Sequence, residues 1–266
     1  MKQKKHPLHG HGYGGANLDN VQIITLKEVD STNNYLRSLP VDEVKNEIVV
    51  VVAKKQTAGR GQRSNSWESE PGKNLTFSIL VRPTFLEVRQ QFILSQAIAL
   101  SIKEVLYDYV RLPHPRIKWP NDIYWNKKKL GGVLIENDLM GKCIDRCIIG
   151  VGVNLNQEHF TSDAPNPVSV WQITGHTTEP LTILRKIMQR FSFYYGQIKQ
   201  GDTHDLVDKY HKALFRRVGF HKFRIPEGVE FDARIRRIEP DGHLVLEDVQ
   251  ERMHSFGFKE VEFVLD

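Results

Sequence analysis

The 266-residue chain has few cysteines and no long apolar run. Its two cysteines, Cys143 and Cys147, do not have the Cys-x-x-Cys spacing of a zinc or dithiol site. We therefore expect reduced thiols in or near a strand, and a reducing cytoplasm as the compartment. No stretch approaches the ~18 apolar residues that a membrane span needs, and the lysine-containing N-terminus lacks the apolar core of a secretory signal. These absences argue against a disulfide scaffold and against a membrane protein.

Several common catalytic and binding motifs are also missing. The sequence has no P-loop spacing, no Gly-x-Gly-x-x-Gly after a strand, no zinc-ligand spacing and no Ser-His-Asp arrangement. The 37 basic and 32 acidic side chains give a formal charge of +5, a mild excess that suits an anionic small molecule or an acidic partner. No zinc-finger, homeodomain or RNA-recognition pattern accompanies the basic residues, so we expect no nucleic-acid binding.

The chain divides into three regions by composition and by the pattern of apolar residues. Residues 1–20 are rich in Gly, His and Lys and are expected to form a flexible tail, although the histidines could bind a metal weakly. Residues 21–218 alternate apolar strand-like runs with helical periods, which predicts one large α+β domain. Residues 219–266 contain closely spaced short strands, which predicts a small β domain packed on the large one, because so few residues make a marginal core alone.

The apolar patterns locate the individual elements. Expected strands cover 21–26, 48–53, 75–81, 116–119, 122–125, 130–136, 143–155, 222–225, 230–238, 243–247 and 253–256. Expected long helices cover 92–109, 181–199 and 203–214. Residues 54–74 form a long polar loop, which in a compact domain is usually functional, and 126–129 form a hairpin turn.

The first candidate site segment is 56–63 (QTAGRGQR), followed by Trp67. Its two glycines allow the backbone to approach a ligand closely, and its two arginines can bracket phosphate or carboxylate oxygens. The Trp67 ring offers a face on which a base can stack. The alternative is an ordinary solvated loop that carries two arginines.

The second segment is 118–122 (KWPND), in which a partly desolvated lysine at a strand end could stabilise developing negative charge. Its Asp122 could hold a divalent cation and its Asn121 could bind a phosphate. The alternative is that Lys118 and Asp122 are ordinary surface residues, because lone Lys and Asp side chains usually only increase solubility.

Two glycine-containing strands complete the set. Segment 127–136 (KKKLGGVLIE) carries a glycine pair inside a strand pattern, which indicates a bulge or a ligand against the backbone. Segment 150–156 (GVGVNLN) has alternating glycines, whose bare face could admit a flat ligand beside Asn154, or could allow close helix packing. Together the four segments describe a pocket for an anion and adenine without a nucleophilic side chain. Such a pocket suits attack of a substrate carboxylate on the α-phosphorus of ATP, where catalysis is mostly positioning and charge stabilisation.

In this order, the segments resemble those of the bacterial biotin protein ligases, in the short form without an N-terminal DNA-binding domain. The resemblance rests on 30–33 (DSTN), 56–61 (QTAGRG), 118–122 (KWPND), 129–136 (KLGGVLIE) and 150–154 (GVGVN). It covers about residues 21–218, and the β-rich remainder resembles the C-terminal domain of the family more loosely. The 20 residues before the first expected strand are too few for a helix-turn-helix unit, so no DNA-binding role is expected.

The resemblance implies an α+β fold: a mixed β-sheet flanked by helices, as in class II tRNA synthetases, with a small C-terminal SH3-like β-barrel. It implies an ATP-dependent, AMP-forming ligase with two half-reactions. Biotin and MgATP give biotinyl-5′-AMP and pyrophosphate, and a lysine of a biotin carboxyl carrier protein then attacks the acyl carbon. A homodimer is compatible with this assignment.

The resemblance also implies roles for individual residues. Catalytic roles are expected for Lys118, near the α-phosphate, for Lys129, at the biotin carboxyl group, and for Arg60, in the closing loop. The expected biotin-binding residues are Ser31, Thr32, Asn33, Gln56, Gly59, Arg60, Gly61, Gln62, Lys129, Gly131 and Gly132. The expected ATP-binding residues are Arg63, Trp67, Lys118, Asn121 and Asn154, with Asp122 as the magnesium ligand.

One departure from the family and two alternative functions accompany this assignment. Many members carry Arg at the position of Gln62, and a neutral amide there should hold the adenylate less firmly. A lipoate or octanoyl ligase on the same fold is an alternative, as is a non-catalytic protein that senses biotin or its adenylate. The Gly-Arg-Gly and KWPND pair favours biotin, and the presence of both Lys118 and Lys129 favours catalysis.

Overall fold

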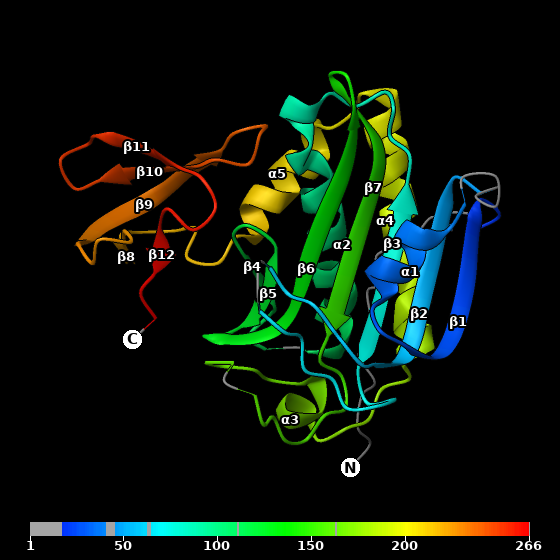
Figure 1. Cartoon of the computed structure of the whole chain (residues 1–266). Helices are drawn as coiled ribbons and strands as arrows, with labels where there is room; N and C mark the ends of the chain where they lie inside the picture. Colours follow the sequence, from blue (N-terminus) through cyan, green and yellow to red (C-terminus); the bar gives the residue numbers. More distant parts are fainter. Residues whose placement is uncertain (1–17, 41–45, 63–64, 111, 163, 266) are drawn as a thin grey trace, which may run out of the picture.

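The computed structural model describes residues 18–40, 46–62, 65–110, 112–162 and 164–265 (Figure 1). Most of the predicted N-terminal tail and the predicted ATP-binding residue Arg63 lie outside the described residues.

A seven-stranded mixed sheet forms the centre of the large domain, in the order β1-β2-β3-β7-β6-β5-β4 (Figure 1). The strands are β1 (Val21–Val29), β2 (Ile48–Gln56), β3 (Leu75–Val81), β4 (Arg116–Lys118), β5 (Asp122–Trp125), β6 (Lys128–Met140) and β7 (Cys143–Val153). Strands β1 and β2 are parallel, and every other neighbouring pair is antiparallel. The mixed sheet expected from the sequence is therefore confirmed.

Helices cover both faces of this sheet, with α1 on one face and α2 and α4 on the other (Figure 1). The helices are α1 (Thr32–Ser38), α2 (Phe92–Tyr109), α3 (Val170–Thr174), α4 (Pro180–Gln200) and α5 (His204–Ala213), with a 3₁₀ turn at Val88–Gln90. Coverage of both faces explains the uninterrupted apolar run of β2. Val49 and Val51 pack with Leu36 of α1, whereas Val50 and Val52 join the larger core on the opposite face.

The second sheet is antiparallel, in the order β11-β10-β9-β8-β12. Its strands are β8 (His221–Arg224), β9 (Glu230–Ile238), β10 (Leu244–Asp248), β11 (Met253–Phe256) and β12 (Glu262–Phe263). The predicted β-rich C-terminal region is present. Its described strands form an open sheet rather than the closed barrel that the resemblance implied, because β11 and β12 do not pair with each other. The boundary near residue 218 stays a prediction.

The hairpin between β5 and β6 differs from the expectation. Only Asn126 and Lys127 form the turn, and Asn126 adopts the left-handed backbone with φ of 52°. Lys129 therefore lies within β6 and not at the turn tip that was predicted for 126–129. The long loop is also shorter than expected, because β2 continues to Gln56, and the short elements α3 and β12 were not predicted.

The C-terminal sheet contacts the large domain at the residue that follows β4. Trp119 is 4% exposed, and its indole N–H donates to the Gly242 carbonyl at 2.9 Å. The Phe258 ring packs against Trp119 and Phe92, with centroids at 5.4 and 6.1 Å. Gly242 has φ of +101°, and a Cβ there would lie 2.8 Å from the Phe92 ring, so glycine is required at this contact. Two loops of the C-terminal sheet thereby hold the KWPND segment in place.

We expect Trp119→Phe to destabilise the protein by about 1–3 kcal/mol, because it leaves the buried Gly242 carbonyl without its donor. The measurement is equilibrium urea unfolding. Trp125→Phe is the matched control, since the Trp125 Nε1 atom is buried without a partner among the described residues. Equal losses for the two variants would show that the hydrogen bond contributes nothing.

Candidate functional site

A cavity of about 850 Å³ opens at one end of the mixed sheet, where α1, the loop after β2, β6 and β7 meet. Its lining includes most of the predicted site residues: Ser31, Thr32, Asn33, Gln56, Arg60, Gly61, Gln62, Trp67, Asn121, Asp122, Lys129, Gly132 and Asn154. Segments far apart in the sequence therefore form one pocket. Lys118, Gly59 and Gly131 are not part of this lining, although each is adjacent in sequence or space to a residue that is.

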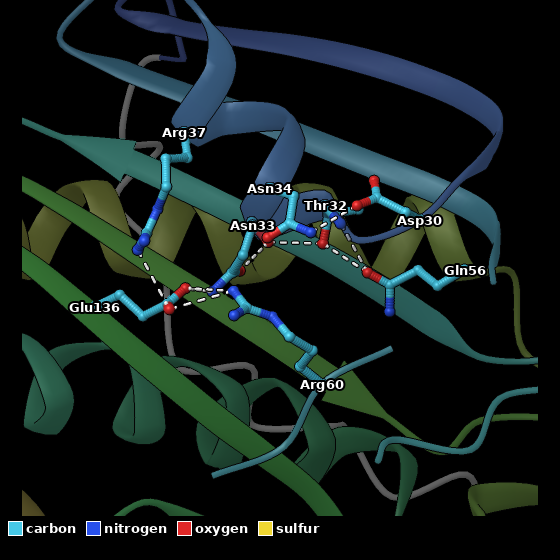
Figure 2. Close-up of polar contacts among 9 residues, drawn as sticks. Asp30, Thr32, Asn33, Asn34, Arg37, Gln56, Arg60 and Glu136 are labelled. Carbon is cyan, nitrogen blue, oxygen red and sulfur yellow. Dashed lines mark hydrogen bonds and ion pairs between the residues drawn. The ribbon is translucent and has the colours of Figure 1, made fainter. Parts of the chain in front are cut away.

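One part of the cavity is lined by a fixed polar network (Figure 2). The Thr32 backbone N–H and hydroxyl donate to Gln56 Oε1 at 2.8 and 3.0 Å. The Ser78 hydroxyl lies 2.6 Å from Thr32 Oγ1 and 2.5 Å from Asn33 Oδ1. Thr32, Asn33 and Ser78 are at most 3% exposed, so each depends on these partners. Ser31 precedes α1 as its N-cap, but its side chain does not cap the helix.

The network continues to a carboxylate that the sequence did not single out as a site residue (Figure 2). Asn33 Nδ2 donates to Glu136 Oε2 at 2.7 Å, and the Arg60 guanidinium donates to the same oxygen at 2.9 Å. The predicted catalytic residue Arg60 is thus paired with a carboxylate in the structure.

The alternating glycines of β7 accommodate side chains of the protein itself. A Cβ at Gly150 would lie 2.4 Å from Asn33 Oδ1, and a Cβ at Gly152 would lie 2.2 Å from the Trp67 indole. The flat group that lies on Gly152 is therefore the Trp67 ring of the protein itself. The sequence had suggested an incoming ligand at this face. The Trp67 Nε1 atom is buried and has no hydrogen-bond partner among the described residues, which is an uncommon state for an indole.

Lys129 lines the cavity and forms an ion pair with Asp122. Its Nζ is 2.8 Å from Asp122 Oδ1 and 5.9 Å from the centroid of the Trp67 ring. A Cβ at Gly132 would come within 3.1 Å of both partners, so this glycine leaves space for the pair. The expected metal ligand Asp122 is therefore also the partner of the expected carboxyl-binding lysine.

Lys118 does not line the cavity but contacts Tyr124, which does. Its Nζ donates to the Tyr124 hydroxyl at 3.3 Å, and it lies 5.6 Å from the Phe263 ring of the C-terminal sheet. Burial lowers the pKa of Lys118 despite the opposing charge of Asp122, and burial raises the pKa of Tyr124 to about 12. Lys118 and Asp122 are paired positions of β4 and β5, so both predicted lysines lie at the same end of the sheet.

The two predicted asparagines are held by the backbone around them. Asn121 Nδ2 donates to the Val133 carbonyl at 2.9 Å, and Asn154 Nδ2 donates to the Val168 carbonyl at 3.2 Å. Asn154 Oδ1 is buried without a partner among the described residues. Gln62 Nε2 makes only a long contact of 3.5 Å to Asn121.

Glu68 joins the two loops that line the open side of the cavity. Its carboxylate accepts from Gln157 Nε2 and Thr161 N–H at 2.9 Å and from Ser162 N–H at 2.8 Å. Burial opposes ionisation, but the Ser162 and Thr161 hydrogen bonds prevail and lower the pKa of Glu68. The loop after β2 is thus tied to the segment after β7.

The carboxylates of the cavity allow a limited test of the expected metal. Across residues 18–265, outside the undescribed gaps, no group of three or more His, Cys, Asp or Glu side chains could hold a metal ion. Of the two described carboxylates that line the cavity, Glu68 is taken up by hydrogen bonds from Gln157, Thr161 and Ser162, and Asp122 faces Lys129. That arrangement fits Mg²⁺, which commonly takes one or two carboxylates together with substrate phosphates, better than it fits an all-protein cage.

The sequence reasoning missed four residues of this site: Ser78, Tyr124, Glu68 and Glu136. Ser78, Tyr124 and Glu136 lie within strands and Glu68 lies in the loop after β2. The partners of Ser78, Glu68 and Glu136 are far along the chain. A polar residue within an otherwise apolar strand such as LTFSILV is the one signal that could have indicated Ser78.

The fold and the site define an α+β protein with a polar cavity at the end of a mixed sheet, lined by Arg60 and Lys129. The model of the biotin/lipoate A/B protein ligase family matches residues 25–154 of this chain.

Known biotin ligases are similar to this chain over different lengths. The bifunctional ligase/repressor BirA of Escherichia coli is 35% identical over 154 residues, 56% of this chain and 45% of that protein. The chain thus spans about half the length of the BirA relatives it matches. The biotin–[acetyl-CoA-carboxylase] ligase of Mycobacterium tuberculosis is 25% identical over 90% of this chain and 86% of its own length. The structure of the Aquifex aeolicus biotin protein ligase in complex with biotin and ATP has a TM-score of 0.75 and 25% identity, covering 91% of this chain and 99% of that one.

No helix of the described segments has the length and apolar character needed to span a bilayer.

We expect Gly152→Ala to displace the Trp67 indole and to destabilise the protein by roughly 1–3 kcal/mol, because the new methyl group overpacks the contact. Thermal unfolding and tryptophan emission measure the two effects. Gly196→Ala is the control, since a Cβ in that part of α4 meets nothing within 4 Å and alanine favours a helix. Unchanged emission and stability in Gly152→Ala would contradict the contact.

Proposed function

We propose that this chain is a biotin protein ligase that forms biotinyl-5′-AMP from biotin and ATP and transfers the biotinyl group to a lysine of a carrier protein. The observation that carries the proposal is the position of Lys129. Its ammonium lies in one cavity with the polar network of Thr32 and Gln56 and with the Trp67 indole. A carboxylic acid with a polar head group and a nucleotide can therefore both reach this cation.

The relatives support both substrates. The Aquifex aeolicus structure that resembles almost the whole chain is a biotin protein ligase in complex with biotin and ATP. The Mycobacterium tuberculosis relative, which aligns with 90% of this chain, is a biotin–[acetyl-CoA-carboxylase] ligase.

In the first half-reaction, Ser31 and the network residues Thr32, Asn33 and Gln56 bind the polar ureido ring of biotin. The backbone of Gly59, Gly61, Gly131 and Gly132, with the side chains of Arg60 and Gln62, completes this part of the pocket. Binding there directs the biotin carboxylate toward Lys129. The side chains of the network are already held by hydrogen bonds without a ligand. Orienting biotin therefore requires little further loss of side-chain entropy.

The biotin carboxylate oxygen then attacks the α-phosphorus of ATP, a bond to that phosphorus forms, and pyrophosphate leaves. Lys129 holds the carboxylate and offsets the charge that accumulates in the transition state. Lys118 adds positive charge from behind Tyr124. Trp67, Asn121 and Asn154, which line the cavity, bind the nucleotide together with Arg63. Mg²⁺, held by Asp122, would neutralise the phosphates.

In the second half-reaction, the neutral amine of an acceptor lysine attacks the acyl carbon, an amide forms and AMP leaves. The acceptor is a biotin carboxyl carrier protein, as the carboxylase in the names of two relatives suggests. The reaction takes place in the cytoplasm, consistent with two free cysteines.

We expect biotin-dependent exchange of labelled pyrophosphate into ATP, and a loss of about 10²–10³-fold in Lys129→Ala, because the reacting carboxylate loses its cation. Lys128→Ala is the matched control, since that neighbouring lysine is exposed and lies outside the cavity lining. Folded protein that exchanges nothing with biotin would contradict the proposal. Exchange with lipoate instead would support the alternative ligase.

The lowered pKa of Lys118 predicts a pH dependence. Its ammonium loses its proton at a lower pH than an ordinary lysine, whose pKa is about 10.4. Adenylation should therefore decline on the alkaline side below that pH, and Lys118→Arg should move the decline upward because arginine stays charged. Lys118→Ala should slow adenylation roughly 10²–10³-fold at neutral pH. An alkaline limb that is identical in the wild type and Lys118→Arg would exclude Lys118 as its origin.

A further inference from the structure

The Glu136 carboxylate receives donors from three separate parts of the chain (Figure 2). Asn33 Nδ2 of α1 lies 2.7 Å from Oε2. The Arg60 guanidinium, from the loop after β2, lies 2.9 and 3.2 Å from the two carboxylate oxygens. Arg37, at the end of α1, lies 3.2 Å from Oε1. Both arginines come within hydrogen-bonding distance of one carboxylate, which they share with an amide.

The position of Glu136 follows from strand alternation. Gly132 and Leu134 of β6 line the cavity, and Glu136 lies two residues further along the same face. Its side chain is 20% exposed, whereas those of Arg37 and Arg60 are 49% and 41% exposed. The carboxylate is therefore the most buried charge of the group, and it is rigidly attached to the central sheet.

Arg60 is connected to the nucleotide side of the cavity through its own loop. Arg60 and Ser66 form an antiparallel bridge, the Trp67 N–H donates to the Gly59 carbonyl at 3.0 Å, and the Gly61 N–H donates to Asn65. The loop thus folds back on itself, and its returning limb carries Trp67 onto Gly152. Fixing Arg60 also fixes the limb that carries Trp67.

From this geometry we infer that Glu136 is a positioning residue that holds the two described limbs of the loop after β2, 57–62 and 65–67, against the cavity through Arg60, and that it orients the Asn33 amide in the same cavity. The Asn33 Nδ2 atom is committed to Glu136, so its Oδ1 faces Ser78 and Gly150. One carboxylate therefore couples the polar network to the loop. This function of Glu136 extends the proposed ligase activity and rests on it only where turnover is measured.

The variant that tests this inference is Glu136→Gln, which preserves side-chain size and removes the negative charge. Arg60 and Arg37 then face each other without a carboxylate between them, and two guanidinium groups repel. Arg37→Ala is the matched control, because it removes the most exposed partner and leaves the Arg60 and Asn33 contacts in place. Glu28→Gln, which breaks the exposed pair with Lys55, controls for loss of a surface ion pair.

The first measurement needs no substrate. Hydrogen–deuterium exchange of ligand-free protein should be faster in peptides covering 57–67 of Glu136→Gln, and unchanged in peptides of α2 and in both control variants. Unchanged exchange in 57–67 would overturn the inference whether or not the protein is a ligase. Faster exchange throughout Glu136→Gln would indicate general destabilisation and would also count against it.

The second measurement concerns the bound acyl-adenylate. Its dissociation should be roughly tenfold faster in Glu136→Gln, equivalent to ~1.4 kcal/mol, while Arg37→Ala stays within twofold of the wild type. In an Arg60→Ala background, Glu136→Gln should add little to loop exchange, because its partner in the loop is already gone. Additive effects of the two substitutions would overturn the coupling. A wild type that forms no adenylate would contradict the proposed function and leave the exchange result to decide the role of Glu136.

Discussion

The site depends on two positions of β7 where the strand carries no side chain. Gly150 lies under the Asn33 amide and Gly152 lies under the Trp67 indole, at distances that no Cβ could tolerate. Asn33 lies in α1 and Trp67 lies in the loop after β2. The two glycines of β7 therefore position side chains from two different walls of the cavity. Glycine weakens a strand interior. In this sheet β7 is paired on both sides, with β3 and β6, and this pairing compensates for the missing side chains.

Where the sequence pattern is long and strictly periodic, it predicts the elements to the residue. The helical period of 92–109 and the β-rich run of 230–238 coincide with α2 and β9. The pattern fails where a charged residue belongs to a regular strand. The three lysines 127–129 resemble a turn, yet Lys129 continues β6 because Asp122 on the neighbouring strand neutralises it inside the cavity. Hydropathy contains no information about such a partner.

The same limit applies to the site. Thr32, Gln56 and Lys129 could be placed in one cavity because each lies in a segment with an unusual composition. Ser78 and Glu136 could not, because nothing in their local sequence indicates their partner Asn33, which lies 45 and 103 residues away from them. Their importance is visible only once the sheet brings these positions together. Strand order, rather than local sequence, determines which polar residues become neighbours.

The cavity-lining cations Arg60 and Lys129 are each paired with a carboxylate from the protein, and the pairs have different consequences. The Lys129 ammonium has three N–H donors, so it can keep Asp122 and still bind a ligand carboxylate. Arg60 instead contacts both oxygens of Glu136 through one terminal nitrogen, Nη2, and this contact ties its guanidinium to the central sheet. In the proposed reaction, Lys129 is therefore suited to follow a charge that moves from the carboxylate to the phosphorus, and Arg60 is suited to hold its loop in place while that charge moves.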